Sequence, residues 1–181
     1  MTTTTRPTTY GSAIVWSIAG TLLLIPAIAM RFTAEVNWTA SDFVVMGLLL
    51  ASVAGAYEFL ARKAPNWTYR AAAAVALLAA LLLVGVNLAI GIIGSENNDA
   101  NMMYAGVLAV AVGGACFARC RSEGMARAMA ATAAAQALVG VIALATGAGA
   151  EGAAWPKDVI GATAILSTMW LASAWLFRRA A

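Results

Sequence analysis

The sequence predicts an all-α membrane protein in which six transmembrane helices form three helical hairpins. Apolar residues make up 62% of the 181-residue chain and charged residues only 10%, a balance far from that of a soluble domain. Six apolar stretches each approach the roughly 20 residues that a helix needs to cross a bilayer core. The connections between these stretches alternate between acidic and basic, so that successive hairpins share one pattern.

The first hairpin is expected over residues 10–64. Its two spans run from Ser12 to Met30 and from Phe43 to Ala61. Pro26 lies near the end of the first span, where we expect a kink because proline lacks the N–H that a helix interior uses. Residues 1–9 are rich in Thr and are expected to form a flexible N-terminal segment.

The second and third hairpins are expected over residues 68–121 and 125–181. The spans of these two hairpins run from Ala71 to Ile93, Met102 to Ala118, Ala128 to Thr146 and Val159 to Phe177. The six spans use most of the chain, so we expect a single transmembrane domain over residues 1–181, with no soluble domain on either side of the membrane.

Lysine and arginine gather at one end of the predicted hairpins. With the amino terminus in the cytoplasm, nine of the 11 basic residues lie on the cytoplasmic face and six of the 8 carboxylates on the other face. Short loops of membrane proteins carry their positive excess on the cytoplasmic side. We therefore expect a multi-pass inner-membrane protein with both termini in the cytoplasm. The pI of about 9.2 then reflects topology, and we expect no nucleic-acid partner because no folded basic module is present.

The three acidic loops resemble one another. In the first and third loops a tryptophan stands between a glutamate and an aspartate that have the same spacing. Because each hairpin has an even number of spans, the repeats run parallel around a predicted pseudo-threefold axis, and their acidic loops converge on one extracytoplasmic mouth. Carboxylates in such a mouth attract cations and can coordinate them, or they simply stay solvated. The candidate ligand-binding residues of this mouth are Glu35, Asp42, Glu96, Asp99, Glu151 and Asp158.

Three polar side chains inside the predicted spans are candidate site residues. Glu58 is the only carboxylate there, and Arg62 follows it at the spacing of a helix-surface ion pair. Glu58 is therefore either half of an interfacial ion pair or a relay for protons or cations. Asn87 and Gln136 lie deeper, where we expect hydrogen bonds to a neighbouring helix or, as the alternative, contact with a ligand.

Signatures of enzymes and cofactors are missing from the sequence. The chain has no His, which removes the usual general base and a common ligand of haem, zinc and copper. Cys116 and Cys120 lie one helical turn apart and are expected to be free thiols. We expect no catalytic residue and no cofactor, and the sequence leaves a metal ion open. An enzyme acting on lipid would have to use the carboxylates for all acid–base chemistry.

Two functions fit this sequence. The first is a small carrier- or channel-like protein whose acidic mouth binds a cation or cationic solute, with Glu58 and Asn87 lining a narrow route between hairpins. The second is a non-catalytic accessory or scaffold subunit of a larger membrane complex, which uses its Ala- and Gly-rich helix faces to bind partner helices, lipid or pigment. Both candidate functions place the chain in contact with the lipid bilayer. A homo-oligomer is compatible with either function.

Overall fold

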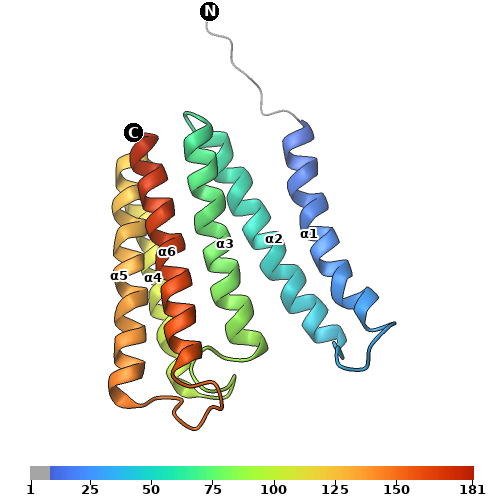
Figure 1. Cartoon of the computed structure of the whole chain (residues 1–181). Coiled ribbons are helices and arrows are strands. Elements are labelled where there is room, and N and C mark those ends of the chain that lie inside the picture. The colour runs from blue at the N-terminus through green and yellow to red at the C-terminus, as the bar shows by residue number, and fades with distance from the viewer. Residues whose placement is uncertain (1–8) are drawn as a thin grey trace, which may run out of the picture. The chain divides into compact units, whose positions relative to one another are not determined.

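The computed structural model describes residues 9–181, and the regular secondary structure in this range is helical. The elements are α1 (Thr9–Ala29), α2 (Ala40–Lys63), α3 (Trp67–Ala89), the short 3-10 helix η1 (Asp99–Met102), α4 (Met103–Phe117), α5 (Ser122–Thr146) and α6 (Lys157–Arg179) (Figure 1). Six spans in the described residues are long and apolar enough to cross a membrane, the fourth being η1 together with α4. These spans confirm the predicted all-α fold and indicate a multi-pass membrane protein. Residues 1–8 of the expected N-terminal segment lie outside the described part.

The helices divide into two compact units. Unit 1 ends at Arg62 and contains α1 and nearly all of α2, whereas unit 2 begins at Lys63 and contains α3 to α6. Within unit 1 the two helices run antiparallel, as the first predicted hairpin requires (Figure 1). They approach each other at Gly47, where an added Cβ would lie 3.7 Å from Cδ2 of Leu23.

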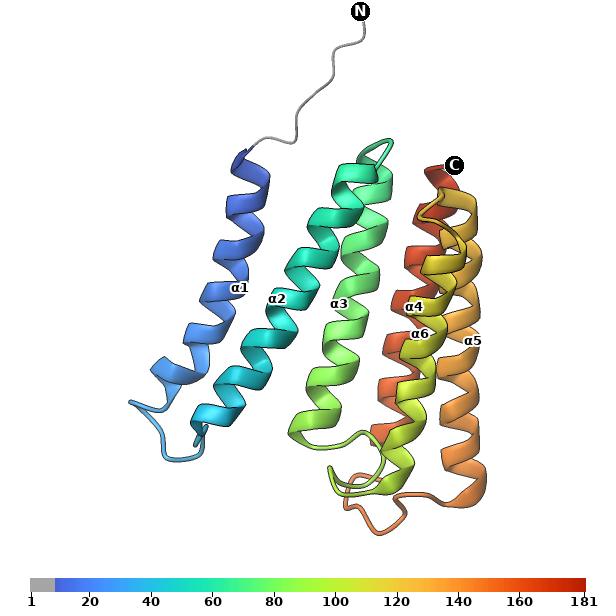
Figure 2. The ribbon, with the colours of Figure 1, turned by 180° about the vertical axis from the view of Figure 1, so that it is seen from behind.

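Unit 2 is a bundle of four helices whose centre is the antiparallel pair α5 and α6. Helix α6 also packs against α3, and α5 also packs against α4 (Figure 2). The main neighbour of α3 is therefore α6 and not α4, the helix with which it was expected to form the second hairpin. Small side chains make this possible, because Ala72, Ala76 and Ala79 of α3 are buried. The pseudo-threefold repeat remains a prediction.

All helix boundaries except the end of α5 differ from the predicted spans, by one to six residues, and two of the larger differences have a clear cause. Helix α3 ends at Ala89 instead of Ile93, because the chain turns at Gly91, whose φ is 69°. Ile92 and Ile93 are only 2% and 0% exposed and fill the loop that follows. Helix α5 begins at Ser122, six residues before the apolar stretch, because its charged first turns extend the helix beyond the apolar part. Hydropathy reports burial or membrane contact and does not by itself mark a helix end.

The contact between α4 and α5 leads to a prediction on stability. An added Cβ at Gly114 would lie 2.7 Å from Cβ of Ala128, whereas one at Gly113 would meet nothing within 4 Å. We expect Gly114→Ala to destabilise the protein by about 1 to 3 kcal/mol through overpacking. Gly113→Ala should be neutral or stabilising by up to about 1 kcal/mol, because alanine is the better helix former. Thermal unfolding in detergent measures both, and equal melting temperatures would contradict this close approach.

Candidate functional site

The α3–α4 and α5–α6 loops lie at the same end of unit 2 (Figure 1). This acidic end carries four of the carboxylates predicted for the outer mouth, namely Glu96, Asp99, Glu151 and Asp158. The opposite, basic end carries Arg119, Arg121, Arg178 and Arg179. The two other predicted residues, Glu35 and Asp42, belong to unit 1, in the α1–α2 loop and in the first turn of α2.

Two of these carboxylates take part in local helix-start geometry. The backbone N–H and the hydroxyl of Thr39 donate to Oδ2 of Asp42 at 2.7 and 2.8 Å. Oδ1 of Asp158 accepts from the backbone N–H of Val159 at 2.7 Å. Acidic residues in the first turn of a helix also interact favourably with the helix dipole. Asp42 and Asp158 thus have a structural role that the mouth prediction did not include.

The two loops of the acidic end touch through glycines. Gly94 and Gly149 have φ angles of 75° and 81°, which residues with a side chain rarely adopt. An added Cβ at Gly149 would lie 2.7 Å from the backbone nitrogen of Gly94. Only glycine fits this contact, so the backbones of the α3–α4 and α5–α6 loops lie directly against each other.

Asn101 holds the α3–α4 loop together from inside. Its Oδ1 accepts from the backbone N–H groups of Ile92 and Ile93 at 3.2 and 2.9 Å, and its Nδ2 donates to the carbonyl oxygen of Ser95 at 2.7 Å. Asn98 caps η1 by accepting from the backbone N–H of Ala100 at 3.0 Å. Sequence reasoning missed the role of Asn101. The available signal was the Gly, Ser and Asn content of the loop, because Asn often bonds to nearby backbone groups in turns.

A polar cavity of about 440 Å³ lies between these two loops. Its lining residues are Gly94, Ser95, Asn98, Gly147, Gly149, Ala150, Glu151 and Gly152. Glu151 supplies a carboxylate, Asn98 an amide and Ser95 a hydroxyl. Because half of the lining residues are glycines, backbone groups of both loops are also accessible to a ligand. The structure thus brings one predicted mouth residue, Glu151, into a cavity with the neutral polar side chains of Ser95 and Asn98.

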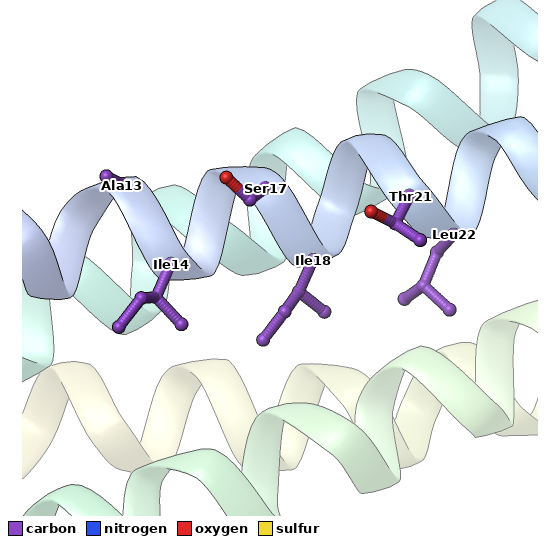
Figure 3. A pocket seen from close by; sticks show the side chains of 6 residues that line it. All are labelled: Ala13, Ile14, Ser17, Ile18, Thr21 and Leu22. Carbon is purple, nitrogen blue, oxygen red and sulfur yellow. The ribbon is translucent and has the colours of Figure 1, made fainter.

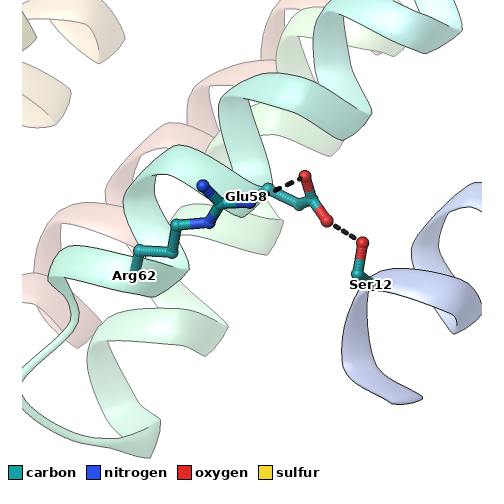
Figure 4. A network of polar contacts seen from close by, with 3 residues as sticks. All are labelled: Ser12, Glu58 and Arg62. Carbon is teal, nitrogen blue, oxygen red and sulfur yellow. Dashed lines mark hydrogen bonds and ion pairs between the residues drawn. The ribbon is translucent and has the colours of Figure 1, made fainter. Parts of the chain in front are cut away.

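Glu58 lies in a small polar network within unit 1 (Figure 4). The hydroxyl of Ser12 donates to Oε1 of Glu58, and Nη2 of Arg62 lies 3.6 Å from Oε2 of Glu58. The ion pair expected from the helical spacing is therefore present. The Glu58 side chain is 20% exposed and that of Arg62 is 65% exposed. The contribution of Ser12, from the other helix of the hairpin, was not expected from the sequence.

The two deep amides do not form the interhelical hydrogen bonds that the sequence predicted. Nδ2 of Asn87 donates to the carbonyl oxygen of Leu83 at 2.9 Å, within α3. A side chain that reaches its own helix backbone one turn earlier needs no neighbouring helix. Gln136 is fully buried, and neither atom of its amide has a hydrogen-bond partner in the described protein. For both residues the expected interhelical bond is therefore wrong.

One face of α1 forms an apolar groove (Figure 3). Its lining residues are Ala13, Ile14, Ser17, Ile18, Thr21 and Leu22, which repeat at helical spacing and so share one side of the helix. Ile14, Ile18 and Leu22 are 59%, 55% and 42% exposed. In a bilayer such a face contacts lipid or another helix.

Residues 9–181 contain no group of three or more Cys, Asp or Glu side chains that could hold a metal ion. The four carboxylates of the acidic end therefore do not form a dehydrated metal site of that kind. Cys116 and Cys120 are free thiols, as predicted. Comparison with protein-family models, curated proteins and solved structures found no match to this chain.

Proposed function

We propose that this protein is a small carrier- or channel-like membrane protein that receives a cation or cationic solute at the acidic end of unit 2. The observation that carries this proposal is the cavity lined by Glu151, Asn98 and Ser95 between two loops in direct contact. One carboxylate with neutral oxygen groups suits a hydrated metal ion or an organic ammonium group. The other carboxylates of this end raise the local cation concentration.

The charge asymmetry of unit 2 supports an orientation. Arg178 and Arg179 end α6 at the basic end, whereas Glu151 and Asp158 lie at the acidic end. By the positive-inside rule the basic end faces the cytoplasm and the acidic end faces outward. The proposal therefore includes an inner-membrane location with cytoplasmic termini.

Thermal unfolding in detergent tests the cation site. The panel is Na⁺, Mg²⁺, Ca²⁺, tetramethylammonium and spermidine, added to the wild type and to three variants. A cation that binds only the folded state stabilises it by about 2.7 kcal/mol at a concentration of 100 times its Kd. We expect at least one cation to raise the melting temperature of the wild type. Glu151→Gln, which removes the carboxylate with little change of shape, should abolish this rise.

Two matched controls remove a carboxylate elsewhere. Glu96 belongs to the acidic end but does not line the cavity, and Glu123 lies at the start of α5, where it pairs with Arg127. Glu96→Gln is expected to weaken the cation effect slightly through the loss of long-range attraction, and Glu123→Gln to leave it intact. A rise that survives in Glu151→Gln contradicts the proposed site, and so does the absence of a rise with every cation in the panel.

The apolar groove of α1 supports a second candidate, the accessory subunit. Its exposed Ile14, Ile18 and Leu22 offer a continuous face to a partner helix. Helices in membranes associate through such faces by close packing, without a hydrophobic driving force between them. A partner protein that stays bound in mild detergent, together with no cation effect on stability, favours this candidate over the carrier.

A further inference from the structure

Three separate segments of unit 2 meet around Tyr69 at the basic end of the bundle. The ring of Tyr69 packs edge to face against that of Phe177, with ring centroids 4.9 Å apart. The hydroxyl of Tyr69 donates to the carbonyl oxygen of Cys120 at 2.8 Å. In the same region, Nδ2 of Asn66 donates to the carbonyl oxygen of Ala180 at 3.3 Å. These contacts join the start of α3, the α4–α5 turn and the end of α6 (Figure 2).

Arginines stand next to each residue that meets at Tyr69. They come from the first turn of α3, the α4–α5 turn and the last turn of α6. We call this set the arginine cluster, and its members are Arg70, Arg119, Arg121, Arg178 and Arg179. Tyr69 directly precedes the first of them, Cys120 lies between the next two, and Phe177 directly precedes the last two. The buried contacts of Tyr69 therefore hold the backbones of all five arginines around one end of unit 2, and all five side chains are exposed.

The arginine cluster has no carboxylate partner among the described residues. The ion pairs Arg62–Glu58 and Arg127–Glu123 do not include a member of the cluster. Glu123 is the acidic side chain closest to the cluster in sequence, and it is already paired with Arg127. Like charges that are held together without counter-ions repel one another and destabilise a fold. An anion from outside the chain would remove this repulsion.

The cluster lies at the level where a bilayer meets water. Arg70 lies in the first turn of α3 and Arg179 in the last turn of α6, and both helices are long and apolar enough to cross a membrane. The guanidinium of Arg179 lies 4.5 Å from the ring centroid of Trp175, whose side chain is 55% exposed. Tryptophan prefers the membrane interface. Stacking on this ring holds the guanidinium at headgroup level and leaves the N–H donors along its edge accessible to an anion.

We propose that the arginine cluster binds the headgroup of an anionic phospholipid. Guanidinium groups bind phosphate oxygens through pairs of parallel hydrogen bonds, and basic residues beside membrane helices attract anionic lipids. A phospholipid also brings acyl chains to the exposed aromatic side chains beside the cluster. These are Trp175 and Phe117, which is 92% exposed two residues before Arg119. A soluble phosphate would neutralise the charge without covering these rings, so the lipid is the better occupant.

Native mass spectrometry of the full chain, released from detergent micelles, tests this lipid site. The protein is incubated with an equimolar mixture of phosphatidylglycerol and phosphatidylcholine with the same acyl chains, so that the two lipids differ only in their headgroups. An arginine near the surface raises the affinity for an anionic lipid by about fivefold. We therefore expect the wild type to retain phosphatidylglycerol at least about tenfold more than phosphatidylcholine. Equal retention of the two lipids would overturn the proposal.

Variants with one or two charges removed locate the site. The double variant Arg178→Gln/Arg179→Gln should lower the preference for phosphatidylglycerol by about tenfold or more, and Arg70→Gln by about fivefold. Lys157→Gln and Arg127→Gln are the controls, because Lys157 begins α6 at the acidic end and Arg127 already has a carboxylate partner. All five side chains are exposed, so these substitutions leave the core intact. A fall in Lys157→Gln as large as that in Arg70→Gln would overturn the proposal, because net charge alone would then explain the binding.

A soluble phosphate shows whether the site recognises the lipid or only its anion. Glycerol 3-phosphate carries a phosphate group without acyl chains. At the same concentration as phosphatidylglycerol it should displace less than about a tenth of the bound lipid, because the acyl chains add affinity that it lacks. Complete displacement would overturn the lipid assignment. This inference does not use the Glu151 cavity, so it stands or fails separately from the cation site.

Discussion

Replacement of Gly149 by alanine is expected to cause a large loss of stability in unit 2. Gly149 has a φ of 81°, a left-handed conformation that costs an alanine about 1 to 2 kcal/mol. Its added Cβ would also lie 2.7 Å from the nitrogen and 3.1 Å from the Cα of Gly94. Backbone atoms cannot rotate away as a flexible side chain can, so the two loops must separate. We expect a total loss of roughly 2 to 5 kcal/mol in the free energy of unfolding.

Gly147→Ala is the matched control for this change. Gly147 belongs to the same loop and has a φ of 68°, but an added Cβ there would meet nothing within 4 Å. Gly147→Ala should therefore lower the free energy of unfolding only through the cost of the left-handed backbone conformation, about 1 to 2 kcal/mol. Unfolding by heat or denaturant in detergent compares the two variants. If Gly149→Ala is no less stable than Gly147→Ala, the direct contact between the loops is refuted.

Asn101→Ala is expected to have the second large effect. The substitution removes the acceptor for the N–H groups of Ile92 and Ile93, two residues that are almost fully buried. Each buried donor left without a partner costs about 1 to 3 kcal/mol. We therefore expect Asn101→Ala to lower the free energy of unfolding by roughly 2 to 5 kcal/mol. Because the α3–α4 loop forms one wall of the Glu151 cavity, the cation-induced rise in melting temperature should disappear as well.

Two further variants show whether this loss comes from the hydrogen bonds. Asn97 is exposed in the same loop, and Asn97→Ala should change stability by less than about 0.5 kcal/mol. Asn101→Asp keeps an acceptor for Ile92 and Ile93 but loses the donor to Ser95, so its melting temperature should fall between those of the wild type and Asn101→Ala. A melting temperature of Asn101→Ala equal to that of Asn97→Ala would show that Asn101 does not hold the loop.

Local features of the site were predictable and distant ones were not. The Glu58–Arg62 pair follows from the spacing of two residues on one helix, and the structure contains it. Ser12 completes that network from another helix, which no local spacing indicates. The cavity around Glu151 needs Ser95 and Asn98 from a loop more than fifty residues earlier in the chain. Gln136 was recognised as a deep amide, but its lack of a partner depends on the side chains that α4 and α6 place around it.

The sequence by itself determined the helical fold, the membrane-spanning length of the helices and the separation of acidic from basic ends. These properties follow from composition and order, because a bilayer requires long apolar helices with polar residues between them. Only the tertiary structure decided that α3 packs against α6, that Ile92 and Ile93 belong to a loop, and that two loops meet at Gly94 and Gly149. In a membrane both the lipid-facing and the packed faces of a helix are largely apolar, so hydropathy alone does not distinguish one packing from another. Steric fits such as that of Gly114 against Ala128 make the choice, and they exist only once the helices are in place.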